Sequence, residues 1–253
     1  MNSRKITGAG IAAITVLLLA LASCEKTFDD KISTTTDLNS AHVQLFVATV
    51  NANRNVIVMD GKRVSRPTLT SGTGFPFAIY PSTGAGTSFT VPGGLHSFSI
   101  ADTLATTTQR PLIFAATLEA SKMYTIFTYD TITSPKQVTV ETPIEIPSDG
   151  SARLRFANFI HDANAVPAVE VFSKRRNEVI FTNVNKTDVT NFISFAPLVV
   201  DTLVIREVGA TAVLAQFNGF VPTGTRSYTL VYRGSQPRGT YPGTRTATVF
   251  ANY

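Results

Sequence analysis

The sequence predicts an all-β protein that contains two tandem antiparallel β-sandwiches. Three observations lead to this prediction. Apolar and polar residues alternate with a period of two in many short segments, which is typical of strands with one buried face. Segments rich in Gly, Pro, Asn and Asp separate these strands at the spacing of a sandwich. The same order of segments also occurs twice along the chain, and no long helical pattern is present.

The first 23 residues have the pattern of a secretory signal peptide. Arg4 and Lys5 form a basic start, and residues 11–22 (IAAITVLLLALA) are almost wholly apolar. A membrane-spanning helix needs roughly 20 consecutive apolar residues, and charged residues follow this run within three positions of its end. Residues 1–23 are therefore predicted to direct export.

The only cysteine of the chain follows this apolar run directly. Leu21-Ala22-Ser23-Cys24 resembles the lipobox of bacterial lipoproteins. The resemblance implies cleavage between Ser23 and Cys24 and lipid attachment to the Cys24 thiol, so that the membrane is a partner through this lipid. Several acyl chains on one residue give a lasting anchor. The implied location is the outer membrane of the cell envelope, either on its periplasmic side or exposed at the cell surface. The alternative is a stray cysteine beside an ordinary cleavage site.

Residues 24–40 are polar and show no period, so they are predicted to form a flexible, disordered tether. Without residues 1–23 the chain keeps 20 basic and 17 acidic residues, a net charge of +3. These charges are spread along the sequence, whereas binding to nucleic acid needs a concentrated basic stripe. Nucleic acid is therefore not an expected partner.

Two copies of one module follow the tether, at residues 41–146 and 152–253. AHVQLFVATVNANRNVIVMDGKRV begins the first copy and ARLRFANFIHDANAVPAVEVFSKRRNEV begins the second, each with a strand, a polar loop, a strand and a basic turn. Seven or eight strands per copy favour an immunoglobulin-like sandwich. The join, residues 145–151 (EIPSDGS), has the composition of a linker. The alternative is a single sandwich that draws strands from both halves.

Alternation also predicts which side chains are buried in the second copy. Leu154, Phe156 and Leu230 are expected in the core, while Arg153 and Arg155 are expected on the face toward water. The same argument places the side chain of Glu170 on the outer face of its strand, because valines flank it.

The second copy resembles the domain of unknown function 4397, a family of secreted and lipid-anchored bacterial proteins, many of them from Bacteroidota. The resemblance rests on DANAVPAVEVF (162–172), TNVNKTDVTNFISFAP (182–197) and SYTLVY (227–232). Copy one matches this family more weakly. The resemblance implies a β fold and an envelope location, and the family has no catalytic residues to carry over.

No pattern in the sequence predicts an enzyme, a cofactor or a metal site. The three histidines are far apart and none stands at a metal-ligand spacing from Cys, Asp or Glu. No nucleophile elbow or phosphate-binding loop is present. The spacing of carboxylates such as Asp162 and Glu170, which glycoside hydrolysis requires, is not determined by the sequence.

Two groups of residues are candidates for binding. The first hairpin tip of each copy is basic, with Lys62 and Arg63 in copy one and Lys174, Arg175 and Arg176 in copy two. The second group is the Arg-rich loop 233–245, where Arg238, Tyr241 and Arg245 have the chemistry to contact acidic sugars. For both groups, an ordinary solvated turn or loop is the alternative.

The predicted function is that of a lipid-anchored, non-catalytic binding or structural module of the cell envelope. Loops on a rigid β scaffold commonly carry binding, and the expected contacts are adhesion, an anionic polysaccharide or other envelope proteins. The alternative is a polysaccharide-processing hydrolase or its accessory subunit, which a convergent carboxylate pair in a cleft would favour.

Overall fold

A computed structural model describes residues 39–66, 68–71, 78–82, 88–143, 145–164, 166–236 and 243–252. The predicted signal peptide, the lipobox with Cys24 and the tether up to residue 38 lie outside these residues. The described residues form strands, turns and loops and contain no helix, so the all-β prediction is confirmed. Within the same ranges, no helix has the length and hydrophobicity needed to span a membrane.

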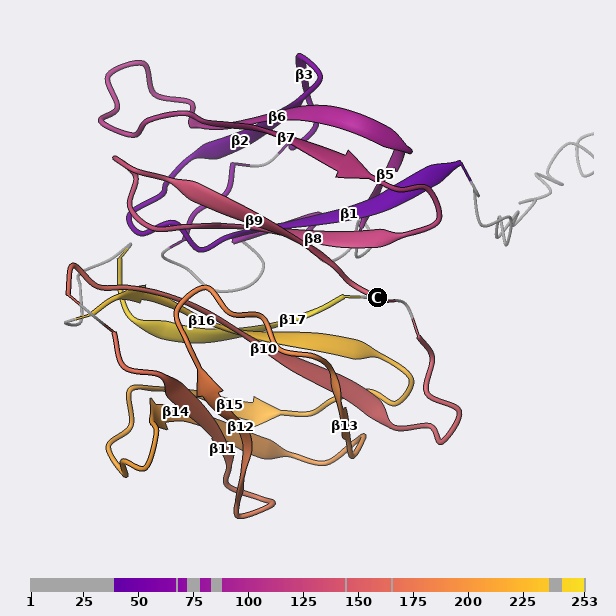
Figure 1. Cartoon of the computed structure of the whole chain (residues 1–253), viewed down its shortest axis with the longest axis vertical. Helices are drawn as coiled ribbons and strands as arrows, with labels where there is room; N and C mark the ends of the chain where they lie inside the picture. The colour runs from indigo at the N-terminus through magenta and orange to yellow at the C-terminus, as the bar shows by residue number, and fades with distance from the viewer. Residues whose placement is uncertain are drawn as a thin grey trace, which may run out of the picture. The chain divides into compact units, whose positions relative to one another are not determined.

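The first half of the chain forms two sheets that pack face to face (Figure 1). One sheet has the order β4-β1-β8-β9, with β5 also paired to β1, and the other has the order β3-β2-β6-β7. The strands of the first sheet are β1 (Ser40–Val47), β4 (Ile79–Tyr80), β5 (Phe89–Pro92), β8 (Met123–Tyr129) and β9 (Lys136–Glu141). Those of the second are β2 (Asn55–Met59), β3 (Lys62–Arg63), β6 (Gly94–Asp102) and β7 (Leu112–Leu118).

The second half forms two further sheets, with the orders β13-β10-β16-β17 and β12-β11-β14-β15 (Figure 1). The first contains β10 (Ala152–His161), β13 (Ile193–Phe195), β16 (Ser227–Ser235) and β17 (Thr246–Ala251). The second contains β11 (Val169–Ser173), β12 (Glu178–Val184), β14 (Asp201–Glu207) and β15 (Ala215–Phe220). Each of the four sheets therefore takes its strands from one half of the chain.

The two halves repeat one topology. The order β1-β8-β9 corresponds to β10-β16-β17, and β3-β2-β6-β7 corresponds to β12-β11-β14-β15. A tyrosine at the start of the late strand repeats as well: the Tyr124 hydroxyl accepts a hydrogen bond from the amide of Glu119, and the Tyr228 hydroxyl accepts one from the amide of Thr223. Both bonds fix the loop that leads into the strand.

One strand pair in each half is parallel, which the prediction of purely antiparallel sandwiches did not include. Strand β1 pairs with β8 in parallel, and β10 pairs with β16 in the same way. Residues 48–122 separate β1 from β8, and residues 162–226 separate β10 from β16, so no hairpin constrains either pair to be antiparallel. All other ladders between named strands are antiparallel.

Each half has its own apolar core between its two sheets. In the second half, Leu154, Phe156 and Leu230 are fully buried in this core, as the alternation predicted. In the first half, Leu45 and Ile126 occupy corresponding positions between the sheets. Burial of large apolar side chains at about 25 cal/mol per Å² is the main favourable contribution in both cores.

A third apolar cluster joins the two halves. It contains Phe46, Ala48, Ala78, Ile79 and Phe127 from the first half and Ala157, Phe159, Val231 and Phe250 from the second. Phe127 and Phe159 pack with ring centroids 4.8 Å apart, and Phe46 stacks on Phe250 at 5.1 Å. The β1-β8 sheet thus packs against the β10-β16 sheet, and residues 37–253 form one compact unit.

This third cluster corrects the expectation that Arg155 faces water. The face of β10 opposite its own core is the face that contacts the first half, so Arg155 is only 2% exposed. Glu170 is on the face of its strand opposite the core, as expected, but it is also buried, and its carboxylate accepts a 2.6 Å hydrogen bond from Nε of Arg206. A buried charge is stable when it is paired in this way.

Candidate functional site

The basic hairpin tips that the sequence singled out are exposed, but they have few free charges. Nε and Nη2 of Arg63 donate to the backbone oxygens of Ser65 and Arg66, at 2.7 and 2.8 Å. Nε of Arg176 lies 2.6 Å from the carboxylate of Glu178. Of the tip cations, Lys62, Lys174 and Arg175 have no carboxylate partner among the described residues.

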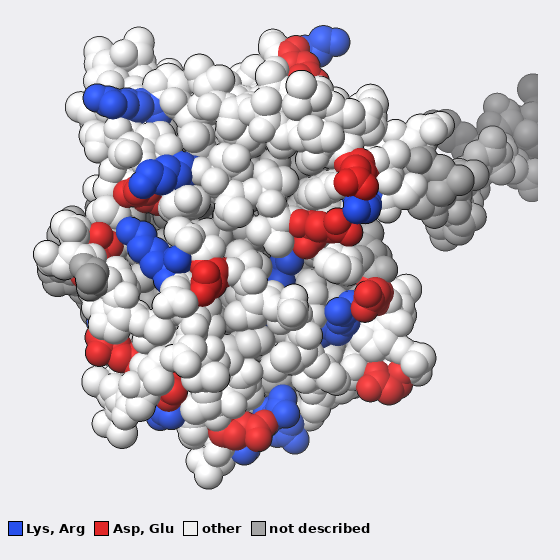
Figure 2. All heavy atoms as spheres, viewed as in Figure 1, with Lys and Arg blue, Asp and Glu red and all other residues white. Residues whose placement is uncertain are grey.

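The two tips do not form one binding surface. The first tip belongs to the sheet of β2 and β3, and the second belongs to the sheet of β11 and β12. The third apolar cluster joins the other two sheets, so the tips are on the two outermost layers of the stack. Lys and Arg side chains alternate with Asp and Glu on the face drawn in Figure 2, and no surface of a single charge is visible there.

The structure describes the Arg-rich loop only in part. Arg238 and Tyr241 lie outside the described residues. Arg245 borders a depression of about 570 Å³ between β15 and β17, together with Gln216 and Thr246. Arg245 is the one charged residue among the described residues that line this depression, so it does not define a site by itself.

His96 and Asp60 form an ion pair that supports the first tip. The imidazole Nδ1 of His96 is 2.7 Å from the Asp60 carboxylate, whose other oxygen accepts a hydrogen bond from the amide of Ser97. The hydrogen bond to Asp60 raises the pKa of His96 above its ordinary value of about 6.5, although burial acts in the opposite direction.

We expect this pair to make stability depend on pH. Because the pKa of His96 is raised in the folded state, its contribution is complete below about pH 6.5 and is lost as the pH rises through the folded-state pKa. NMR titration should show a raised pKa for His96 in the natural protein and a lower one in Asp60→Asn. Thermal unfolding between pH 5.5 and 8 should show a steeper loss of stability in the natural protein than in the variant; parallel curves would contradict the assignment.

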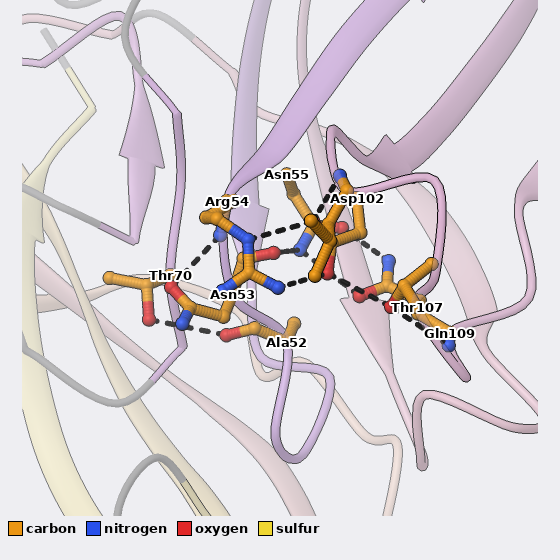
Figure 3. Close-up of polar contacts among 9 residues, drawn as sticks. Ala52, Asn53, Arg54, Asn55, Thr70, Asp102, Thr107 and Gln109 are labelled. Atoms are coloured by element: carbon orange, nitrogen blue, oxygen red, sulfur yellow. Dashed lines mark hydrogen bonds and ion pairs between the residues drawn. The ribbon is translucent and has the colours of Figure 1, made fainter.

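A polar cluster at one end of the first sandwich is structural (Figure 3). Nε and Nη2 of Arg54 donate to the two carboxylate oxygens of Asp102, at 3.1 and 2.8 Å. The side chains of Asn55 and Gln109 donate to each other. Burial acts to raise the pKa of Asp102, but hydrogen bonds from Leu104, Arg54 and Thr107 hold it below its ordinary value. The groups satisfy one another, so the cluster ties the loop before β2 to the loop after β6.

The arrangement best suited to binding is a cleft at the junction of the two halves. It has a volume of about 260 Å³ and is formed by the end of β9, the start of β10 and the loop before β13. We call it the arginine cleft and define it by Glu141, Arg153, Arg155, Asn191 and Phe192, which line it together with Val140, Pro143, Val189 and Thr190.

The strand geometry of β10 places both arginines in this cleft. Residues two apart on a strand point to the same face, and here that face is turned toward β9 of the first half. The guanidinium carbons of Arg153 and Arg155 each lie 4.8 Å from the centroid of the Phe192 ring. Cation–π attraction of this kind holds the arginines in defined positions.

Arg155 is a buried cation with only neutral partners. Its Nε donates to the Thr229 hydroxyl at 2.9 Å, and its Nη2 donates to the hydroxyls of Thr125 and Thr142 at 3.1 and 2.9 Å. No carboxylate of the described residues contacts it. Burial lowers the pKa of Arg155 to about 9, so the side chain is still charged at neutral pH.

The described residues show no arrangement typical of an enzyme active site. No group of three His, Cys, Asp or Glu side chains within the described ranges is placed to hold a metal ion. Glu170 is engaged with Arg206, and the Asp162 carboxylate accepts a hydrogen bond from the amide of Asn164. Neither carboxylate lines the arginine cleft, so they do not form the pair in a cleft that would favour the hydrolase alternative.

Comparison with known proteins adds little to this geometry. No family model matches the chain, and no curated protein sequence matches it, so the resemblance to the domain of unknown function 4397 stays a prediction. Among solved structures, a family 26 carbohydrate-binding module of Amy13K from Eubacterium rectale, in complex with maltoheptaose, matches over 83% of this chain and 96% of its own. The identity is 11% and the TM-score is 0.25. A similarity this low transfers neither a ligand nor a binding residue.

Sequence reasoning missed the arginine cleft, although one signal was present. Arg153 and Arg155 stand on one face of a strand whose other face is apolar, a pattern that usually predicts a face toward water. Two arginines at alternate positions of a long strand also fit an interface with a second sheet. The loop with Phe192 is distant in sequence from these arginines, and the position of β9 beside β10 depends on how the two halves pack, so the pattern could not name either partner.

Proposed function

We propose that this protein is a lipid-anchored, non-catalytic binding module of the bacterial cell envelope that contacts polysaccharide through the arginine cleft. The cleft is the observation that supports a binding role. Two arginines, one aromatic ring and a side-chain amide line a partly enclosed space between two sheets. Concave sites with a few placed polar groups are the usual form of small-ligand sites.

The size of the arginine cleft suits one sugar residue of a polymer. Its volume of about 260 Å³ lies just below the range of roughly 300 to 1,000 Å³ that is usual for pockets holding a whole small ligand. The side-chain amide of Asn191 has no hydrogen-bond partner among the described residues and offers both donors and an acceptor to a sugar hydroxyl.

The envelope location rests on the sequence. The resemblance of residues 21–24 to a lipobox supports lipid attachment at Cys24, and the outer membrane is the proposed place of the anchor. A polysaccharide or another envelope component is then within reach of the folded part of the chain. The basic tips are secondary candidates, because two of their cations are already engaged.

Filling the arginine cleft is expected to abolish binding. The mature chain, made soluble by Cys24→Ser, would be applied to an array of neutral and acidic polysaccharides beside Asn191→Trp, which places a bulky ring at the mouth of the cleft. We expect the parent chain to bind at least one polysaccharide class and Asn191→Trp to lose this binding with an unchanged melting temperature.

The matched control for this experiment changes the tips. Lys62→Ser, Lys174→Ser and Arg175→Ser together should leave binding intact, because these exposed side chains are on other sheets. Surface changes of this kind normally shift stability by less than about 0.5 kcal/mol. Absence of binding to every polysaccharide by the parent chain would overturn the proposed function, and loss of binding only in the tip variant would move the site to the tips.

A further inference from the structure

We propose that the arginine cleft recognises a single carboxylate group, carried by an acidic sugar residue, and that Arg155 is the residue that holds it. This inference rests on the proposed function and adds the chemical class of the ligand. Each charged side chain that lines the cleft has an ionic partner among the described residues, except Arg155.

Of the charged side chains that line the cleft, Arg155 is the one without an ionic partner among the described residues. Nη1 of Arg153 lies 2.9 Å from the carboxylate of Glu145, and the carboxylate of Glu141 lies 3.0 Å from Nζ of Lys122, which Glu119 also contacts at 3.0 Å. Arg155 has no carboxylate partner among the described residues. Removing a charge from water without a counter-ion is strongly unfavourable, and one bound monoanion would compensate this charge.

The hydrogen bonds of Arg155 leave two of its N–H donors available for a ligand. A guanidinium has five N–H groups. Three of them, one on Nε and two on Nη2, donate to threonine hydroxyls. The two N–H groups of Nη1 have no partner in the described part of the chain, and Arg155 lines the cleft. Charge-assisted hydrogen bonds from arginine to a carboxylate are among the strongest polar contacts in proteins.

The surroundings favour a carboxylate over a phosphate dianion. Glu141 lines the same cleft, so a second negative charge on the ligand would be repelled by its carboxylate. A carboxylate brings one charge and two acceptor oxygens, which the unused N–H groups of Arg155 can meet. The unpartnered amide of Asn191 can bind a ring hydroxyl, which favours a sugar acid over the carboxyl terminus of a peptide.

The three threonine hydroxyls that accept hydrogen bonds from Arg155 also have other partners. The hydroxyls of Thr125 and Thr142 bond to each other at 2.8 Å, and the Thr229 hydroxyl donates to the side chain of Asn252 at 2.8 Å. Each hydroxyl therefore keeps a partner when the guanidinium is removed. Replacing a buried charge by an apolar side chain of similar length is often neutral or stabilising, so Arg155→Met is expected to fold.

The test measures binding of methyl glucuronoside and of its methyl ester, which has the same ring without the charge, by calorimetry with the Cys24→Ser mature chain. We expect the acid to bind about 30-fold more tightly than the ester or better, the change that corresponds to a hydrogen-bonded charge pair. Arg155→Met should lose this preference while its melting temperature is unchanged or raised. Arg226→Met, a change of an exposed arginine outside the cleft, is the matched control and should keep the preference.

Several outcomes would overturn the inference. Equal binding of the acid and the ester would show that the cleft does not recognise a carboxylate. Binding of neutral sugars that Asn191→Trp blocks would also overturn the carboxylate assignment, but it would leave the proposed function intact. A preference for the acid that persists in Arg155→Met, or a large fall in melting temperature with unchanged binding, would make Arg155 a purely structural residue. Tighter binding of an acetylated dipeptide with a free carboxyl terminus than of the sugar acid would overturn the sugar assignment.

Discussion

Replacing Cys24 with serine is expected to move the protein from the membrane fraction to the soluble fraction. The apolar run before Cys24 is too short to span a membrane, and the proposed anchor is the lipid on its thiol. Each buried CH₂ of an acyl chain contributes about 0.8 kcal/mol, so loss of all chains removes the attachment completely. Fractionation of cells and incorporation of labelled fatty acid would measure the effect.

A relocated cysteine is the control for this prediction. Ser33→Cys in the Cys24→Ser chain restores a thiol without the three preceding lipobox residues, so it should not restore labelling. Fatty acid that still appears on Cys24→Ser would contradict the lipobox assignment. Retention in the membrane fraction without fatty acid would show that another contact holds the protein there.

Truncating Phe127 to alanine is expected to destabilise the whole chain by about 3 to 5 kcal/mol. This side chain is fully buried in the third apolar cluster and contacts Phe46, Phe159 and Phe250. Its loss leaves a cavity between the two halves instead of within one of them. Chemical denaturation of the soluble chain, followed by circular dichroism, would measure the change in the free energy of unfolding.

Ile113→Ala is the control, because Ile113 is 74% exposed and its truncation should change stability by less than about 0.5 kcal/mol. A near-neutral effect of Phe127→Ala would mean that the stability of the two halves does not depend on their contact.

Residues 148–253 expressed alone should keep the core around Phe156 but expose Phe159 and Phe250. The fragment is therefore expected to be less stable than the same residues in the whole chain, and to self-associate.

The alternation in the strands predicted the fold class and the two inner cores. Leu154, Phe156 and Leu230 lie where the period of two placed them, because alternation is a local property of a strand and follows from its pleat. The two halves also share one strand order in their sheets. The parallel pairing of β1 with β8 was not predicted, since strands distant in sequence have no turn between them to indicate their direction.

The candidate sites were harder to predict than the fold. Lys62 and Arg63 form the short strand β3, whereas residues 174–176 are in a turn. The hydrogen bonds that engage Arg63 and the ion pair of Arg176 depend on neighbours that fold beside them. Arg155 looked like a solvent-facing residue because its strand has one apolar face. Its burial depends on a second sandwich that docks on the other face.

The sequence by itself determined the strands, their inward faces, the two copies and the lipobox pattern at Cys24, because each of these is read from neighbouring residues. Only the tertiary structure decided that the outer faces of the β1-β8 and β10-β16 sheets are also buried, and that Arg153, Arg155 and Phe192 meet Glu141 across the junction. The physical reason is that packing between sheets brings together residues far apart in the chain. Whether a polar strand face meets water or another sheet is decided by that packing and not by the strand's own residues.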